Sequence, residues 1–271
     1  RFGEIMKYFL FLLSFSITFI STGIKADWVY SSNGLQSGNV ISFTVKGNII
    51  FAGVEGSGIF TSTNNGQTWN QSLQYGNIYS LTANSSAVFA ANCIGYLPNI
   101  SGEIRRSLND GVSWTTTGFT DLWVKAIAAN GNTIFAGTTF ATGGGYLYIS
   151  TNNGTTWNPV SIGSGVFSLA IEGNTIYAGT YNQGVYRSTN NGLNWNQTSL
   201  NNQYVVSLSC SGNNVYAGTY YDGIYCSTNN GSSWFHPSLS TGKVYCNISN
   251  VNYVMMGTVY GVYVSSNLGL N

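Results

Sequence analysis

The sequence predicts an all-β protein, and three observations support this prediction. A short motif recurs along the chain, stretches of alternating apolar and polar residues lie between its copies, and Gly and Asn mark the turns. Charged residues make up only 6% of the 271 residues, but hydrophobic residues reach 43% and aromatic residues 15%. A disordered chain would be poor in hydrophobic and aromatic residues, so the composition indicates a folded domain.

The N-terminal residues are expected to be a targeting segment. Lys7 precedes an apolar run, Tyr8–Ile20, and Ser21–Ala26 is a small and polar exit. This is the layout of a secretory signal peptide, and the run is too short to span a bilayer comfortably. We therefore expect upstream residues and a signal peptide in 1–26 and a single domain in 27–271. The domain would be extracellular, at the cell surface or periplasmic, with no integral membrane span after cleavage. An uncleaved N-terminal anchor is the alternative.

The repeated motif is Ser-x-Asn-x-Gly-x-x-Trp. It occurs at Ser62–Trp69, Ser107–Trp114, Ser150–Trp157, Ser188–Trp195 and Ser227–Trp234. A sixth copy, Ser265–Asn271, lacks the Trp. A period of about 40 residues, built of short strands, is typical of a β-propeller in which each repeat forms one blade.

The fourth repeat shows the strands that we expect in each blade. Val166–Ile171 alternates between apolar and polar residues and predicts the first strand. Thr175–Thr180 and Gly184–Ser188 predict the second and third strands. Asn194–Thr198 predicts a fourth strand, which the Trp of the motif opens. Four short antiparallel strands in each repeat are the pattern of a blade.

Each residue of the motif has a structural interpretation. Asn tolerates left-handed backbone and bonds to the local backbone, so Asn64 and its equivalents can fix the turn. Gly66 supplies positive φ without steric cost, and Trp69 returns into the blade and buries a large ring. The residues with these structural roles are Asn64, Gly66, Trp69, Asn109, Gly111, Trp114, Asn152, Gly154, Trp157, Asn190, Gly192, Trp195, Asn229, Gly231 and Trp234. The Ala-Gly pairs, such as Ala178-Gly179, suit places where strands approach closely.

The motif resembles the Asp-box, or BNR repeat. This repeat is found in sialidases, sortilin-type receptor ectodomains, photosystem II assembly factors and many secreted bacterial propellers. The resemblance covers residues 38–271 and implies a β-propeller in which the box is a structural turn on the face opposite the ligand. Asn64 and its equivalents stand where the family usually has Asp, so the turn contacts can persist without the charge.

The two ends of the chain are complementary in sequence. Trp28–Leu35 is similar to a box Trp with its strand, as in Trp195–Leu200. Joining Trp28–Leu35 to the three strands of the last repeat would complete a sixth blade and remove exposed sheet edges. We therefore predict six blades closed by the N-terminal strand, or seven if the gene continues past Asn271.

Candidate ligand-binding residues lie on the face opposite the box turns. There the loops between second and third strands meet the loops between blades. The candidates are Glu55, Trp123, Tyr181, Tyr220, Tyr221, Asp222 and Tyr260, and Tyr75, Tyr96, Asp121, Phe140 and Tyr204 are expected on the same face. Trp123 could stack on a sugar or peptide, or pack between blades. Tyr181, Tyr220 and Tyr260 recur at equivalent positions, which favours a structural ring but also allows a binding surface. The loops Ala91–Gly102 and Thr138–Gly145 are longer than the repeat demands.

The charged residues argue against the common catalytic sites. A sialidase-like site needs three converging arginines, but Arg105 and Arg106 are adjacent on one strand and point to opposite faces. Glycosidases need two carboxyl groups about 5–10 Å apart. The acids available are Glu55, Asp121 and Asp222, with Glu103 at the start of a strand, and solvated loop acids are the simpler interpretation. We therefore predict no catalytic residues.

The sequence predicts no metal, cofactor or nucleic-acid site. His236 follows a box Trp, which we expect on the wrong side of the blade for a channel site, and it has no Cys or His partner. Cys93 is expected in a loop and the other three cysteines in strands, without zinc-site spacing. A net charge of +1 provides no basic patch for phosphates.

The sequence therefore favours a secreted, non-catalytic binding or scaffold propeller that recognises a protein or glycan through its loops. The first alternative is a glycoside hydrolase that acts on a polysaccharide with Asp or Glu. The second alternative, implied by the family resemblance, is a chaperone similar to the photosystem II assembly factors.

Overall fold

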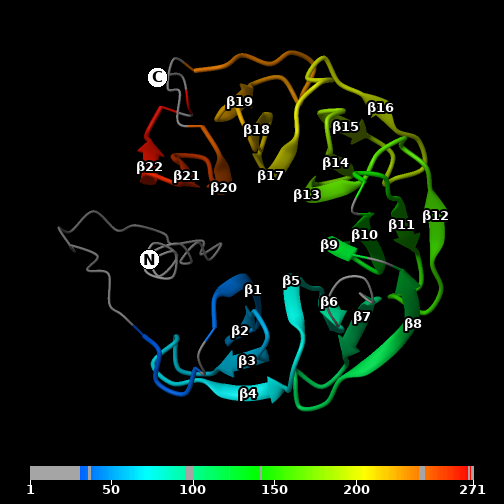
Figure 1. Cartoon of the computed structure of the whole chain (residues 1–271), viewed down its shortest axis with the longest axis vertical. Coiled ribbons are helices and arrows are strands. Elements are labelled where there is room, and N and C mark those ends of the chain that lie inside the picture. Colours follow the sequence, from blue (N-terminus) through cyan, green and yellow to red (C-terminus); the bar gives the residue numbers. More distant parts are fainter. Residues whose placement is uncertain are drawn as a thin grey trace.

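The computed structural model shows an all-β architecture. It describes residues 31–35, 38–94, 101–121, 123–140, 142–237, 242–267 and 269. In these residues the chain forms strands β1 to β22 and no helix. The strands make six antiparallel sheets, which follow one another around a common centre (Figure 1). The protein is therefore a six-bladed β-propeller, as the sequence predicts.

The first three blades each have four strands. Blade 1 contains β1 (Val40–Lys46), β2 (Ile49–Val54), β3 (Gly58–Ser62) and β4 (Asn70–Leu73). Blade 2 contains β5 (Asn77–Ala83), β6 (Val88–Ile94), β7 (Ser101–Ser107) and β8 (Thr115–Asp121). Blade 3 contains β9 (Trp123–Asn130), β10 (Thr133–Thr139), β11 (Leu147–Ser150) and β12 (Asn158–Val160).

Blade 4 also has four strands, whereas blades 5 and 6 have three each among the described residues. Blade 4 contains β13 (Val166–Glu172), β14 (Thr175–Thr180), β15 (Val185–Ser188) and β16 (Asn196–Gln197). Blade 5 contains β17 (Val205–Ser211), β18 (Asn214–Thr219) and β19 (Ile224–Ser227), and blade 6 contains β20 (Val244–Ser249), β21 (Val254–Thr258) and β22 (Gly261–Ser265). In blade 5, a single bridge between Cys226 and Phe235 replaces the fourth strand.

The long loop expected at Ala91–Gly102 is partly strand. The ladder between β6 and β7 continues through the pairs Cys93↔Gly102 and Ile94↔Ser101, so both strands are longer than predicted. Cys93 is consequently a buried strand residue, 3% exposed, and the prediction that it lies in a loop is wrong. The loop expected from Thr138 begins later as well, because β10 continues to Thr139.

Each box is a turn held by two side chains. Ser62 Oγ accepts the Gly66 amide at 2.9 Å, and Asn64 Oδ1 accepts the Thr68 amide at 2.9 Å. Asn65, which lies between Asn64 and Gly66, has the left-handed backbone (φ 55°) that we expected at Asn64. In this box, Asn64 therefore supplies the acceptor oxygen, and the next residue, Asn65, has the positive φ.

Glycine in the second strands lets successive blades approach closely. A Cβ added to Gly179 would lie 2.6 Å from Val205 Cγ1, in the first strand of the next blade. A Cβ on Gly137 would lie 2.5 Å from Val166 Cγ1 in the same way. The predicted crowding at the Ala-Gly pairs is therefore confirmed at these positions, and it lies between blades.

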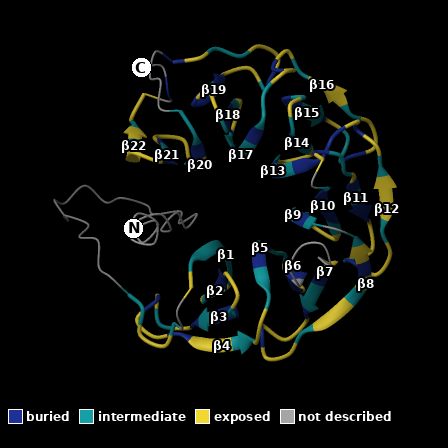
Figure 2. Cartoon of the chain, in the orientation of Figure 1, coloured by how far each residue is buried: buried dark blue, intermediate teal, exposed yellow. Residues whose placement is uncertain are grey.

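No strand among the described residues covers the side of blade 6 that faces away from blade 5. Val262 and Val264 in β22 are 53% and 57% exposed (Figure 2). At most 4% is exposed for the residues aligned with Val262 in the other third strands, which are Ile59, Ile104, Leu147, Val185 and Ile224. In the other blades this position packs toward the following blade.

The predicted closing strand is only partly within the described residues. Trp28 lies outside them. Ser31 Oγ donates a hydrogen bond to Gly66 O in the box of blade 1, and Asn33 O accepts the Trp69 amide. Ser72 Oγ donates to Gly111 O in the box of the next blade in the same way, at 2.5 Å. Ser31 thus occupies the position that a fourth-strand residue of a preceding blade would take.

Candidate functional site

Every innermost strand carries one extra residue near its start. In blade 3, Val124 and Ala126 pair with consecutive residues of β10, so Lys125 is left out of the ladder as a β-bulge. The bulged residues of the six blades are Ile41, Tyr79, Lys125, Phe167, Val206 and Tyr245. The innermost strands line the centre of the ring (Figure 1). Because each bulge is near the start of its strand, all six bulges lie at the same end of this centre. We call this end, where the first strands begin and the second strands end, the loop face.

Five aromatic side chains form a continuous group on the loop face. We call this group the aromatic band, and it consists of Phe167, Tyr181, Tyr204, Tyr220 and Tyr221. Tyr204 is central, with ring centroids 4.8 Å from both Phe167 and Tyr181. Its ring stacks on Tyr220 at 5.1 Å with an interplanar angle of 8°. Tyr221 continues the band 4.8 Å from Tyr220 and is 67% exposed. Burial, followed by the neighbouring tyrosines, raises the pKa of Tyr204 to about 12.

Two lysines on this face lie over aromatic rings. Lys125 Nζ is 3.5 Å from the ring centroid of Tyr79 and 5.0 Å from that of Trp123. Lys243 Nζ lies 4.0 Å from the centroid of Tyr220. A cation within about 6 Å of a ring centroid is attracted by the negative face of the ring. We call Lys125, Tyr79 and Trp123 the Lys125 site.

The Lys125 site is partly withdrawn from water. Burial lowers the pKa of Lys125, and the nearby Cys93 and Glu55 partly oppose this. Burial also raises the pKa of the Cys93 thiol, whose Sγ lies 3.9 Å from Val124 O. Both shifts indicate a low-dielectric environment behind the ammonium group.

The predicted site residues form two groups. Tyr181, Tyr220 and Tyr221 belong to the aromatic band, and Trp123 belongs to the Lys125 site. Tyr260 is 77% exposed and contacts no other aromatic ring among the described residues, so the structure does not bring it into the band. Lys125 was missed because the bulge that presents it has no fixed residue type.

The acidic candidates have separate local partners. Glu55 Oε2 accepts Asn39 Nδ2 at 2.8 Å, and Asp121 Oδ2 accepts Thr138 Oγ1 at 3.2 Å. Glu103 Oε1 accepts Arg105 Nε at 2.6 Å. Asp222 is exposed on the loop after β18. No hydrogen bond joins two carboxyl groups among the residues that the structure describes.

Glu103 and Asp121 cannot share one pocket although they are close in blade 2. Glu103 pairs with Thr120, and Asp121 pairs with the neighbouring Gly102. Consecutive strand residues point to opposite faces of a sheet, so the two carboxylates diverge. The arginines also separate, because Arg106 Nη1 donates to Asn153 O of blade 3.

His236 lies near the loop face, contrary to the sequence prediction. Its Nε2 is 2.5 Å from Asp222 O, and its ring centroid is 4.9 Å from that of Tyr225. The segment after Trp234 crosses the blade from the box turn toward the loop face, which carries His236 with it. The described residues hold no group of three His, Cys, Asp or Glu side chains suited to a metal ion.

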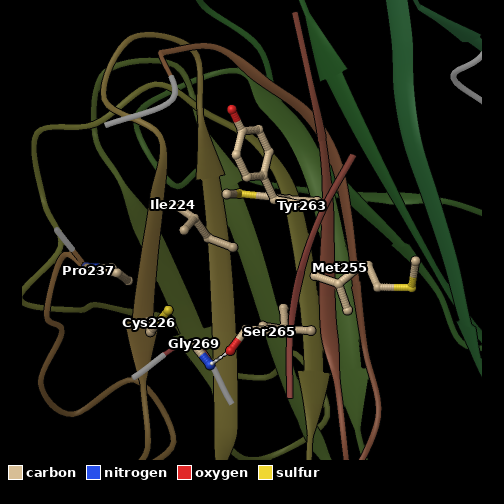
Figure 3. A pocket seen from close by; sticks show the side chains of 10 residues that line it. Ile224, Cys226, Pro237, Met255, Tyr263, Ser265 and Gly269 are labelled. Carbon is tan, nitrogen blue, oxygen red and sulfur yellow. Dashed lines mark hydrogen bonds between the residues drawn. The ribbon is translucent and has the colours of Figure 1, made fainter. Parts of the chain in front are cut away.

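An apolar pocket lies between blades 5 and 6 (Figure 3). Its lining residues are Ile224, Cys226, Pro237, Val254, Met255, Met256, Tyr263, Val264, Ser265 and Gly269. Pro237 is three residues after Trp234, as Thr198 is after Trp195, and Thr198 Oγ1 accepts Trp234 Nε1 of the next blade at 3.2 Å. The pocket is therefore at the place where a box Trp packs in the other blades, and we interpret it as part of the architecture.

Comparisons with known proteins agree with this architecture. The model of the BNR/Asp-box repeat matches residues 148–159, which include the third box. No curated protein sequence matches the chain. The described residues contain no apolar helix of membrane-spanning length.

Several solved structures share the fold at low sequence identity. The GH74 enzyme of Niastella koreensis is 20% identical over 89% of this chain and 38% of its own, with a TM-score of 0.61. The extracellular domain of the hybrid two-component system BT4673 from B. thetaiotaomicron is 16% identical over 84% of this chain and 32% of its own, with a TM-score of 0.65. This chain therefore spans about a third of the length of these two proteins.

A third structure matches over most of both chains. YCF48 bound to D1 peptide is 12% identical over 86% of this chain and 80% of its own, with a TM-score of 0.64. These identities show the fold alone. The chain is therefore a six-bladed β-propeller, and its third box matches the BNR/Asp-box repeat.

Proposed function

We propose that this protein is an extracellular, non-catalytic binding propeller that recognises a protein or glycan through the aromatic band. The band is the observation that carries the proposal. Phe167, Tyr181, Tyr204, Tyr220 and Tyr221 span two blades on the loop face, and their rings contact one another in series. Aromatic groups with an apolar ring and a polar hydroxyl suit a binding surface.

The separated acids also support a binding function. Glu55, Glu103 and Asp121 each bond to a local neighbour, and the side chains of Glu103 and Asp121 point to opposite faces of blade 2. General acid–base chemistry at a glycosidic bond needs two carboxyl groups that flank it. The similar structures include an enzyme, an extracellular domain and a peptide-bound protein, so the fold is compatible with binding as well as catalysis.

A ligand screen with paired variants tests the proposal. The purified chain is applied to a glycan array and used in pull-downs, followed by affinity measurement on any ligand found. We expect Tyr204→Ala and Tyr220→Ala to weaken binding about tenfold or more, since each removes a ring from the band. Tyr253→Ala is the matched control, because Tyr253 is exposed on the turn between β20 and β21, at the box side.

Two outcomes contradict the proposal. Binding that is unaffected by both tyrosine variants would place the ligand elsewhere. Detectable hydrolysis of a polysaccharide that is lost in Asp222→Asn or Glu55→Gln would support the glycoside hydrolase instead. Export through residues 1–26 is part of the proposal, and N-terminal sequencing of the protein recovered outside the cytoplasm would locate the cleavage site.

A further inference from the structure

Neither of the two loop-face lysines forms an ion pair with another described residue, although Glu55 lies near Lys125. In the described part of the chain, the ion pairs are Lys46–Asp110 and Arg105–Glu103. Lys125 and Lys243 instead lie against aromatic rings. An ammonium group has three donors and no acceptor, and a ring face satisfies its charge but not its hydrogen bonds. Each lysine therefore retains the capacity to bind an anion.

The lysines flank the aromatic band in the order of the blades. Lys125 is in blade 3, Phe167 and Tyr181 belong to blade 4, and Tyr204 and Tyr220 belong to blade 5. Lys243 precedes the first strand of blade 6, and its Nζ lies over the rings of Tyr220 and Tyr245. The order around the ring is therefore cation, aromatic rings, cation.

We propose that the loop face binds an acidic glycan, whose carboxylates pair with Lys125 and Lys243 while its sugar rings stack on the band. This inference rests on the proposed binding function and names its ligand class. A chain of uronic acids alternates flat pyranose faces with carboxylates, which is the pattern that this surface complements. The partial burial of Lys125 strengthens such a pair, because charges interact more strongly away from water.

An acidic peptide fits this surface less well. Extended peptides gain affinity by adding main-chain hydrogen bonds to a free sheet edge. The loop face presents the ends of strands and the turns between them, so it offers rings and side-chain donors instead. Two acidic residues oppose such a ligand. Glu55 lies near enough to Lys125 to act on its charge, and Asp222 is exposed next to Tyr221, so both carboxylates would repel a polyanion.

Calorimetric titration with a galacturonic acid hexamer tests the proposal. The comparison ligand is the same hexamer with its carboxyl groups reduced to neutral galactose. We expect the acidic hexamer to bind at least about tenfold more tightly and to weaken as salt is raised. Lys125→Gln and Lys243→Gln should each remove most of this preference, and Asp222→Asn should increase it. Lys46→Gln is the matched control, because it removes the same charge on the box side.

The outcomes separate this inference from the proposed function. Equal binding of both hexamers that depends on Tyr204 would overturn the acidic ligand and leave the binding function standing. Binding of an acidic peptide from an array, with no affinity for either hexamer, would do the same. Thermal unfolding of each variant confirms that it folds, and Lys125→Arg, which keeps the charge, should retain the preference if Lys125→Gln loses it.

Discussion

The box turn explains at the residue level why Asn can replace Asp. Asn190 Oδ1 accepts the Asn194 amide at 2.9 Å and the Ser188 hydroxyl at 2.9 Å. The turn therefore uses a carbonyl-type oxygen, and neither of these two contacts needs a negative charge. In the first box, Asn64 Nδ2 also donates to Thr68 Oγ1 at 2.8 Å, a bond that Asp could not make.

Asn190→Ala should lower the free energy of unfolding by about 1–3 kcal/mol, because it leaves the Asn194 amide and the Ser188 hydroxyl without their acceptor. Asn190→Asp keeps the acceptor oxygens and should stay close to the parent. Urea unfolding measures both variants. Equal destabilisation by Ala and Asp would show that the amide group, and not the oxygen, holds the turn.

At the level of the element, the second and first strands of successive blades set the spacing of the ring. Gly179 in β14 faces Val205 in β17, and a Cβ at Gly179 would also lie 2.3 Å from Ser168 Oγ. Contacts under 3 Å require the backbone or the neighbouring side chain to move, so this glycine fixes how closely blades 4 and 5 pack.

Gly179→Ala should therefore destabilise the protein by about 1–3 kcal/mol, which is typical of overpacking. The double variant Gly179→Ala, Val205→Ala removes the contact between the added methyl group and Val205 Cγ1, although the contact with Ser168 Oγ stays, and it serves as the control. It should lose less than the sum of the two single variants in thermal unfolding. Strict additivity would indicate that the two positions do not contact each other.

The sequence predicted the elements well, but it could not predict the bulges. The box and the alternation of Val166–Ile171 give the strand order, because the same pattern recurs in each repeat. The bulges depend on the register between two strands, which the pattern of one strand does not reveal. Lys125 and Phe167 share this position without sharing a residue type. The Lys125 site was therefore missed. Tyr220 was a candidate because it recurs at an equivalent position in several repeats, and Trp123 because it lies outside the boxes.

At the scale of the whole molecule, the exposed outer side of blade 6 bears on how the ring closes. The pocket in Figure 3 lies where a box Trp packs in other blades, and Ser31 takes the place of a preceding fourth strand beside Gly66. Trp28 precedes Ser31 by three residues, as Trp69 precedes Ser72. These observations agree with closure of the ring by the N-terminal strand, which stays a prediction and can be tested.

If Trp28 completes blade 6, Trp28→Ala should lower the hydrogen-exchange protection of the amides of β22, which would lose their outer partner. The amides of β15 in blade 4 are the internal control and should not change. Unaltered protection in both strands would mean that Trp28 does not close the ring.

The bulge in each innermost strand has a further consequence, for how such a protein can change. On one side of the bulge stands a β-branched residue, such as Val166, and on the other a small one, such as Ser168. These flanking residues pair with the second strand, but the bulged residue does not. The pairing of the strands therefore places little restriction on the side chain of the bulged residue. Ile41, Tyr79, Lys125, Phe167, Val206 and Tyr245 accordingly differ in size, polarity and charge. Substitutions at these six positions can therefore change the loop face without changing how the strands pair.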